Sequence, residues 1–309
     1  MNSFRKLAIA SLCATFALVA IGGLVRATKS GLGCGDDWPH CNGRLAPALE
    51  TRAEIIEFSH RAAAGVVVIL IATLAVLALR RHRGSPRIVW TSVGALALVL
   101  SQALIGALVV KLDLKAESVV LHLGTAMFLV AVLVYLVAAA SPRDESATSD
   151  RSLSRQAGGA ALAVFLLLLV GSYVTGKGAG LVFPDWPLMN GTPIPDLGTE
   201  DAAVHFVHRA LAAVVGGIVF ITGMRLVRRG GPAAARLGRA AIVLYAAEVL
   251  IGAANVWSDL NAAFVTAHLA LAALIWGSLS GAAVLLHPAM ERVAERRAPA
   301  GRAALEGSR

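Results

Sequence analysis

One set of short motifs occurs twice in this 309-residue chain. The first copy reads Asp37-Trp38-Pro39, Asn42-Gly43 and His60-Arg61-Ala62, and the second reads Asp185-Trp186-Pro187, Asn190-Gly191 and His208-Arg209-Ala210. Each part lies 148 residues before its counterpart (185 − 37). Further on, Leu104-Ile105-Gly106-Ala107 and His122-Leu123 recur 146 residues later (268 − 122) as Leu250-Ile251-Gly252-Ala253 and His268-Leu269. The pattern indicates a tandem duplication, and duplicated membrane proteins place functional sites at equivalent positions.

The residues around the repeat are those of a membrane protein. The chain is 57% hydrophobic and 15% charged, and its apolar residues form unbroken runs. A membrane span needs about 20 apolar residues. Eight runs of this kind cover roughly 7–27, 55–79, 88–110, 117–140, 157–176, 202–226, 236–257 and 261–286. The sequence therefore predicts an all-α integral membrane fold with eight transmembrane helices. The first run could also be a secretory signal, but no Ala-x-Ala-type cleavage site ends it.

The duplicated unit contains four helices, which is an even number. Both copies then insert in the same orientation, as two tandem four-helix bundles related by a pseudo-two-fold axis along the membrane normal. We expect an N-terminal half over residues 1–140, a polar cytoplasmic linker over 141–156 and a C-terminal half over 157–309 that ends in a basic tail.

The net charge of +9 is concentrated in short loops, with no soluble module on which a nucleic acid could dock. By the positive-inside rule, the basic loops and both termini are cytoplasmic and the cell membrane is the expected location. The basic segments are Arg80–Arg83, Arg143–Arg155, Arg225–Arg239 and Arg292–Arg302.

Two of the three cysteines lie together in the first outer loop. Cys34 and Cys41 are on the side of the membrane where disulfides persist, so we expect a disulfide between them. Two free thiols remain an alternative, and a metal site with His40 is a weaker one. Cys13 lies within the first span and is expected to be inert.

Four histidines lie within spans, where an ionisable group is costly and points to function. His60 and His122 each lie about five residues into a predicted helix that enters the membrane from the outer side. His208 and His268 repeat this arrangement in the second half. Both members of a pair would lie about 7–8 Å below the outer helix ends. Paired imidazoles at one depth suit a metal in a bundle core, and haem iron is the commonest such metal. The alternative is that duplication copied two packing histidines.

Two arginines and three departures from symmetry complete the candidate site. Arg61 and Arg209 could pair with haem propionates or reach lipid headgroups. Cys34 and Cys41 align with Phe183 and Met189, and Gln102 aligns with Glu248. Glu57 aligns with His205 and lies three residues before His60, on the same helix face. A carboxylate there could exchange protons with chemistry at a metal, or it could be an interfacial group. The first half therefore looks reactive, and the second resembles an electron-storing or structural cofactor site.

These residues together resemble the haem A synthase family over nearly the whole chain. The resemblance also uses Gly31-Leu32-Gly33, Thr175-Gly176 and Phe183-Pro184. It implies an oxidoreductase that converts the ring methyl of haem O into the formyl group of haem A by successive hydroxylations, for use in cytochrome oxidase. His208 and His268 would hold a resident haem b, and His60 and His122 would flank the substrate haem. Glu57 would be required nearby, and the Cys34–Cys41 disulfide would support the reaction or haem transfer.

The resemblance also implies partners, and rival functions stay open. An external electron donor is needed, because the chain carries no flavin, nicotinamide or iron–sulfur motif, and the haem O-forming farnesyl-transfer enzyme is a possible partner. The rivals are a di-haem cytochrome b-type electron carrier, a thiol–disulfide oxidoreductase using Cys34 and Cys41, and a haem-insertion chaperone.

Overall fold

The structure is a computed structural model that describes residues 3–45, 47–141, 149–288 and 290. Within these residues, eight helices are long and apolar enough to cross a membrane. They are α1 (Ser3–Ala27), α2 (Arg52–Arg81), α3 (Pro86–Lys111), α4 (Ala116–Ala140), α5 (Arg151–Lys177), α6 (Glu200–Arg229), α7 (Gly231–Trp257) and α8 (Ala262–Leu286). The predicted all-α membrane fold is confirmed. The basic tail over Arg292–Arg302 and much of the expected linker lie outside the described residues.

The helices extend beyond the apolar runs because polar residues begin them. The side chain of Thr51 accepts a hydrogen bond from the backbone N–H of Glu54 at the start of α2, and Thr199 does the same for Ala202 in α6. The carboxylate of Asp150 caps α5 in the same way. Helix α5 therefore begins at Arg151, inside the segment expected to be a linker. A short 3₁₀ helix, η1 (Ala179–Leu181), follows it and was not expected.

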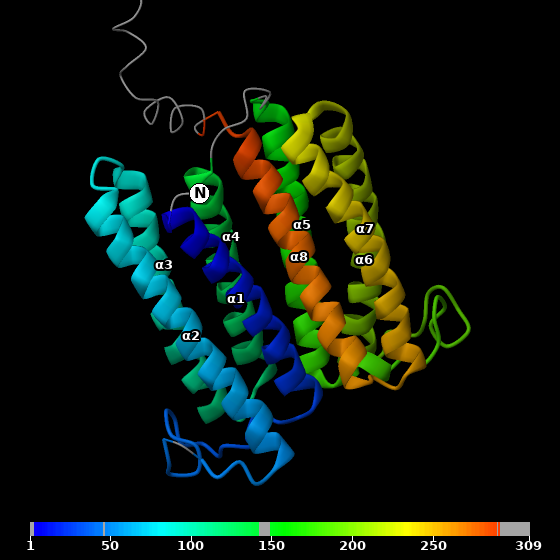
Figure 1. Cartoon of the computed structure of the whole chain (residues 1–309). Coiled ribbons are helices and arrows are strands. Elements are labelled where there is room, and N and C mark those ends of the chain that lie inside the picture. The colour runs from blue at the N-terminus through cyan, green and yellow to red at the C-terminus, as the bar shows by residue number, and fades with distance from the viewer. Residues whose placement is uncertain (1–2, 46, 142–148, 289, 291–309) are drawn as a thin grey trace, which may run out of the picture.

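Each half packs as a closed ring of four helices. In the first half, α1 contacts α2, α2 contacts α3, α3 contacts α4, and α4 returns to α1. The second half repeats this order of neighbours with α5, α6, α7 and α8. Figure 1 shows the two groups side by side, with α1 and α4 facing α5 and α8. This arrangement is compatible with the expected pseudo-two-fold relation.

The turns are repeated as well as the helices. The bonds before Pro39 and Pro187 are both cis, and Asn42 and Asn190 both have positive φ. Short backbone bridges pair Cys41 with Arg44 and Met189 with Thr192. The loops that follow α1 and α5, over residues 28–45 with 47–51 and over 178–199, extend from the same end of the bundles (Figure 1). The duplication therefore governs loop conformation as well as helix order.

The halves meet along a seam formed by α1, α4, α5 and α8. The indole Nε1 of Trp276 on α8 donates a 3.0 Å hydrogen bond to the carbonyl oxygen of Met127 on α4, and both residues are buried. Near the outer end, the Arg26 guanidinium on α1 donates to the carbonyl oxygens of Thr175 and Gly176 on α5. Polar contacts inside a membrane protein are made between helices because lipid offers no partner. These contacts fix the two halves against each other.

Candidate functional site

The four span histidines lie on helices that stand diagonally opposite in each ring. His60 is on α2 and His122 on α4, whereas His208 is on α6 and His268 on α8. His60 and His208 each follow the first residue of their helix by eight positions, and His122 and His268 by six. The rise of an α-helix puts them about 9–12 Å from those ends. They are thus deeper than the 7–8 Å expected; for His60, His122 and His208 the reason is that the helix begins before the apolar run.

The second-half pair is close enough to share one metal ion. The ring centroids of His208 and His268 are 6.4 Å apart, with the ring planes at 79°. Two metal–nitrogen bonds of about 2 Å each, together with the radii of two imidazole rings, require a separation of about 6 Å. The distance therefore fits an iron ligated by both side chains.

The histidines have buried nitrogen atoms that the protein leaves without hydrogen bonds. The Nδ1 atoms of His60, His122 and His208 are buried with no hydrogen-bond partner among the described residues. An unsatisfied buried polar group costs about 1–3 kcal/mol and calls for a functional explanation. In the first half, His60 and His122 are near enough to interact electrostatically. The Nδ1 atoms of these three rings are therefore not engaged by other described side chains.

Each histidine ring rests against a glycine of the preceding helix, a feature that the sequence analysis missed. A Cβ added at Gly171 would lie 2.8 Å from Cε1 of His208, and one at Gly22 would lie 3.1 Å from Cε1 of His60. The corresponding distances are 3.4 Å from Gly106 to His122 and 3.2 Å from Gly252 to His268. These glycines recur at nearly the offsets of the histidines, which is the signal that could have found them. A side chain at Gly171, Gly22 or Gly252 would compete with the imidazole for space, whereas a Cβ at Gly106 would be in ordinary contact with it.

Glu57 connects helix α2 to the disulfide loop. Its side chain is only 3% exposed. Oε2 accepts a 2.8 Å hydrogen bond from the backbone N–H of Cys34, and Oε1 forms a 2.6 Å ion pair with Nη2 of Arg61. Cys34 and Cys41 form the predicted disulfide. The carboxylate that the sequence placed near His60 is thus held by the loop and by the next turn of its own helix.

The loop approaches the helix closely at one glycine. A Cβ at Gly33 would lie 2.4 Å from the carbonyl carbon of Ala53, in the first turn of α2. Only glycine permits such an approach of two backbones. This contact brings Cys34, the next residue, to the Glu57 carboxylate.

Arg61 and Arg209 bind the loops that precede their helices. Nη1 of Arg61 donates to the carbonyl oxygens of Asp37 and His40, and Nη1 of Arg209 donates to those of Asp185 and Leu188. In the second half the position of Glu57 is taken by His205, whose Nε2 accepts a 3.1 Å hydrogen bond from Nε of Arg209. Both guanidinium groups therefore stabilise a loop over its histidine helix, a role that the sequence analysis did not anticipate.

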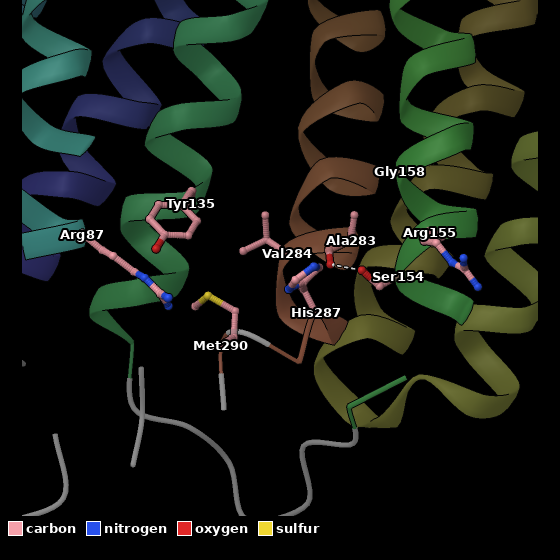
Figure 2. Close-up of a pocket in the computed structure, with 9 residues that line it drawn as sticks. All are labelled: Arg87, Tyr135, Ser154, Arg155, Gly158, Ala283, Val284, His287 and Met290. Atoms are coloured by element: carbon pink, nitrogen blue, oxygen red, sulfur yellow. Dashed lines mark hydrogen bonds between the residues drawn. The ribbon is translucent and has the colours of Figure 1, made fainter. Parts of the chain in front are cut away.

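A cavity of about 530 Å³ lies at the other end of the bundles. It is lined by Arg87, Tyr135, Ser154, Arg155, Gly158, Ala283, Val284, His287 and Met290. Figure 2 shows the Ser154 hydroxyl bonded to the Ala283 carbonyl oxygen across α5 and α8, and Arg155 directed away from Arg87. The cavity contains none of the paired histidines, so we distinguish it from the candidate site.

The fold and the site define a class: a multi-pass membrane protein with two opposed histidine pairs in duplicated bundles. A family model described as COX15-CtaA, cytochrome oxidase assembly protein, matches residues 5–280. The Heme A synthase of Staphylococcus haemolyticus is 31% identical over 279 residues, covering 87% of this chain and 91% of that protein. The Heme A synthase of Symbiobacterium thermophilum is 31% identical over 266 residues, covering 82% and 85%. The chain belongs to the COX15-CtaA family.

Proposed function

We propose that this chain is a haem A synthase, an oxidoreductase that oxidises the ring methyl of haem O to the formyl group of haem A. The observation that carries the proposal is the opposed pair of His208 and His268, whose positions the repeat duplicates as His60 and His122, in a chain whose relatives are named Heme A synthase. An electron carrier or a haem-insertion chaperone could use the same pairs, but neither is suggested by the relatives.

The two halves take different roles in this proposal. His208 and His268 hold a resident haem b, which when bound supplies an iron that stores and passes single electrons. His60 and His122 flank the substrate, haem O, in the first half. The support for the second-half assignment is the 6.4 Å ring separation, and the support for the first half is that His60 and His122 occupy the duplicated positions. The proposed division between the halves falls before α5, which begins at Arg151 within the expected 141–156 linker.

Glu57 is the proposed catalytic residue of the first half. It is a buried carboxylate one turn from His60 and has no counterpart in the second half, where His205 stands. Arg61 holds the carboxylate on one side and the Cys34 N–H holds it on the other. A carboxylate positioned by two donors can accept or return a proton at the adjacent substrate without reorganising. Arg61 and Arg209 would also be the cations nearest to haem propionates.

The proposal includes partners and an orientation. The basic loops indicate that both termini are cytoplasmic, so the histidine pairs lie toward the outer side of the cell membrane. Reducing equivalents come from an external donor. Haem O is delivered by the farnesyl-transfer enzyme that forms it.

The deciding experiment is pigment extraction with mass analysis from cells that make this chain with and without a haem O supply. We expect haem A and its hydroxylated precursor only when haem O is present. Recovery of haem B alone, at a fixed ratio to protein, would favour the electron carrier. Recovery of bound but unaltered haem O would favour the chaperone.

Variants of the two halves separate the proposed roles. We expect Glu57→Gln to lower haem A formation by roughly 10²-fold or more and to leave the second-half haem spectrum unchanged. His208→Ala should abolish that spectrum instead. Glu50→Gln, on the exposed outer loop, is the control. Full haem A yield from Glu57→Gln would show that the carboxylate has no role in the reaction.

A further inference from the structure

Glu248 is a buried carboxyl group inside a span, and the roles assigned so far do not use it. It lies on α7 and is 9% exposed. Its Oε1 atom is 3.2 Å from Nδ1 of His268, and its Oε2 atom is buried without a partner among the described residues. A carboxyl group in lipid surroundings is costly and is retained where it has a function. Within the described residues, the polar atom closest to this carboxyl group belongs to a histidine of the candidate site.

The ring and the carboxyl group are in reach but not fully aligned. The separation of 3.2 Å is at the long end of hydrogen-bonding distances, and the Nδ1 atom does not meet the angular criteria for a hydrogen bond. Gly252 lies one turn after Glu248 on α7 and contacts the same ring at Cε1. The face of α7 thus presents a carboxyl group and a glycine without a side chain to one imidazole.

The first half lacks this contact. Gln102 takes the position of Glu248, but its Nε2 donates to the carbonyl oxygen of His122 and to Oγ1 of Thr125. The Nδ1 atom of His122 is left without a partner. Leu271 stands where the repeat would place Thr125 (125 + 146), so the hydroxyl group that engages Gln102 in the first half has no equivalent at this position of the second half. Two substitutions between the copies, Gln to Glu and Thr to Leu, therefore redirect this side chain from the helix backbone to the imidazole.

We infer that Glu248 is a positioning residue that accepts the Nδ1 proton of His268 in a hydrogen bond, directs Nε2 at the iron and lowers the reduction potential of the resident haem. The inference rests on the proposed function. A carboxyl acceptor on Nδ1 fixes the tautomer of a ligating imidazole and makes its other nitrogen a stronger donor. A stronger donor stabilises the oxidised iron. The resident haem is thereby the better reductant, as a site that passes electrons to the first half must be.

The test is a redox titration of the resident haem in the purified full-length protein. We expect Glu248→Leu to shift the midpoint potential to more positive values and Glu248→Gln to shift it less, since an amide oxygen is a weaker acceptor. The matched control is Gln102→Leu, at the equivalent position of the other half, which should leave the potential of the resident haem unchanged. The binding of haem is read separately from the absorption spectrum and the haem-to-protein ratio.

The outcomes separate the inference from the proposed function. A potential that stays at the wild-type value in both Glu248 variants, with haem fully bound, would overturn the inference. If the Glu248→Leu variant loses its haem, the inference is tested by the midpoint potential of Glu248→Gln alone, and a wild-type value there would overturn it. Retention of haem by the His208→Ala, His268→Ala double variant would instead overturn the assignment of the second-half site itself.

Discussion

At the scale of single residues, the four glycines beside the histidines are as specific as the histidines. A Cβ added at any of these glycines would lie within 3.4 Å of an imidazole ring. The sequence predicted the histidines because ionisable groups are conspicuous within apolar runs. It did not predict the glycines, because glycine is common in membrane helices and only the rotation of one helix against its neighbour reveals which glycine faces a ring.

Gly171→Ala tests this packing at its tightest point. The added Cβ would approach Cε1 of His208 to 2.8 Å, so the ring must turn away from His268. We expect a several-fold loss of resident haem, measured as the haem-to-protein ratio after purification. The control is Gly159→Ala on the same helix, where a Cβ meets nothing within 4 Å. The control should keep its haem and gain up to about 1 kcal/mol from helix propensity. Equal haem content in the two variants would contradict a steric role for Gly171.

At the scale of elements, the spans were predicted to within a few residues and the polar contacts were not. The length of a hydrophobic run matches the thickness of the bilayer core that the helix must cross, so the spans can be found from the sequence. The cap at Asp150 extended α5 into the expected linker, since helix ends depend on single hydrogen bonds. The partners of Arg61 and Arg209 depend on how the outer loops fold back, and that path is not visible in hydropathy. The loop disulfide was predicted because the outer side of the membrane favours it.

Removal of the Cys34–Cys41 bond should affect both the disulfide loop and the position of Glu57 on α2. The loop places the Cys34 N–H against Glu57, so we expect Cys34→Ser, Cys41→Ser to lower haem A formation without changing the second-half haem spectrum. A bridge across so short a loop contributes about 2 kcal/mol to the free energy of unfolding. Product analysis and thermal unfolding measure the two effects. The control is Cys13→Ala, since Cys13 is outside the loop. An unchanged product yield would separate the disulfide from Glu57.

At the scale of the whole molecule, the repeat and the order of the helices determine which helix ends lie on the same side of the membrane. The even number of spans in each copy and the basic loops predict parallel copies with cytoplasmic termini, and the side that each end faces stays a prediction. It could not predict the seam, because the residues of α1, α4, α5 and α8 that meet there are as apolar as those that face lipid. In a membrane, small differences in packing select the partner of a helix.

Single cysteines measure the orientation. In a background without Cys13, Glu50→Cys on the first outer loop should react with a membrane-impermeant maleimide in intact cells. Gly84→Cys, in the turn between α2 and α3, should react only after the cells are made permeable. Both positions are exposed, so a difference in labelling reports the side of the membrane rather than burial. The reverse pattern would place the histidine pairs toward the cytoplasm.

The seam between the halves has a consequence for electron flow. Helix α4 carries His122 and packs directly against α8, which carries His268. The Trp276–Met127 hydrogen bond crosses the same contact. Under the proposed function, an electron stored in the second half can tunnel to the first through covalent bonds and tightly packed atoms, over a path that neither lipid fluidity nor loop motion alters. The duplication would then supply a fixed path for electron transfer between the halves as well as a second copy of the site.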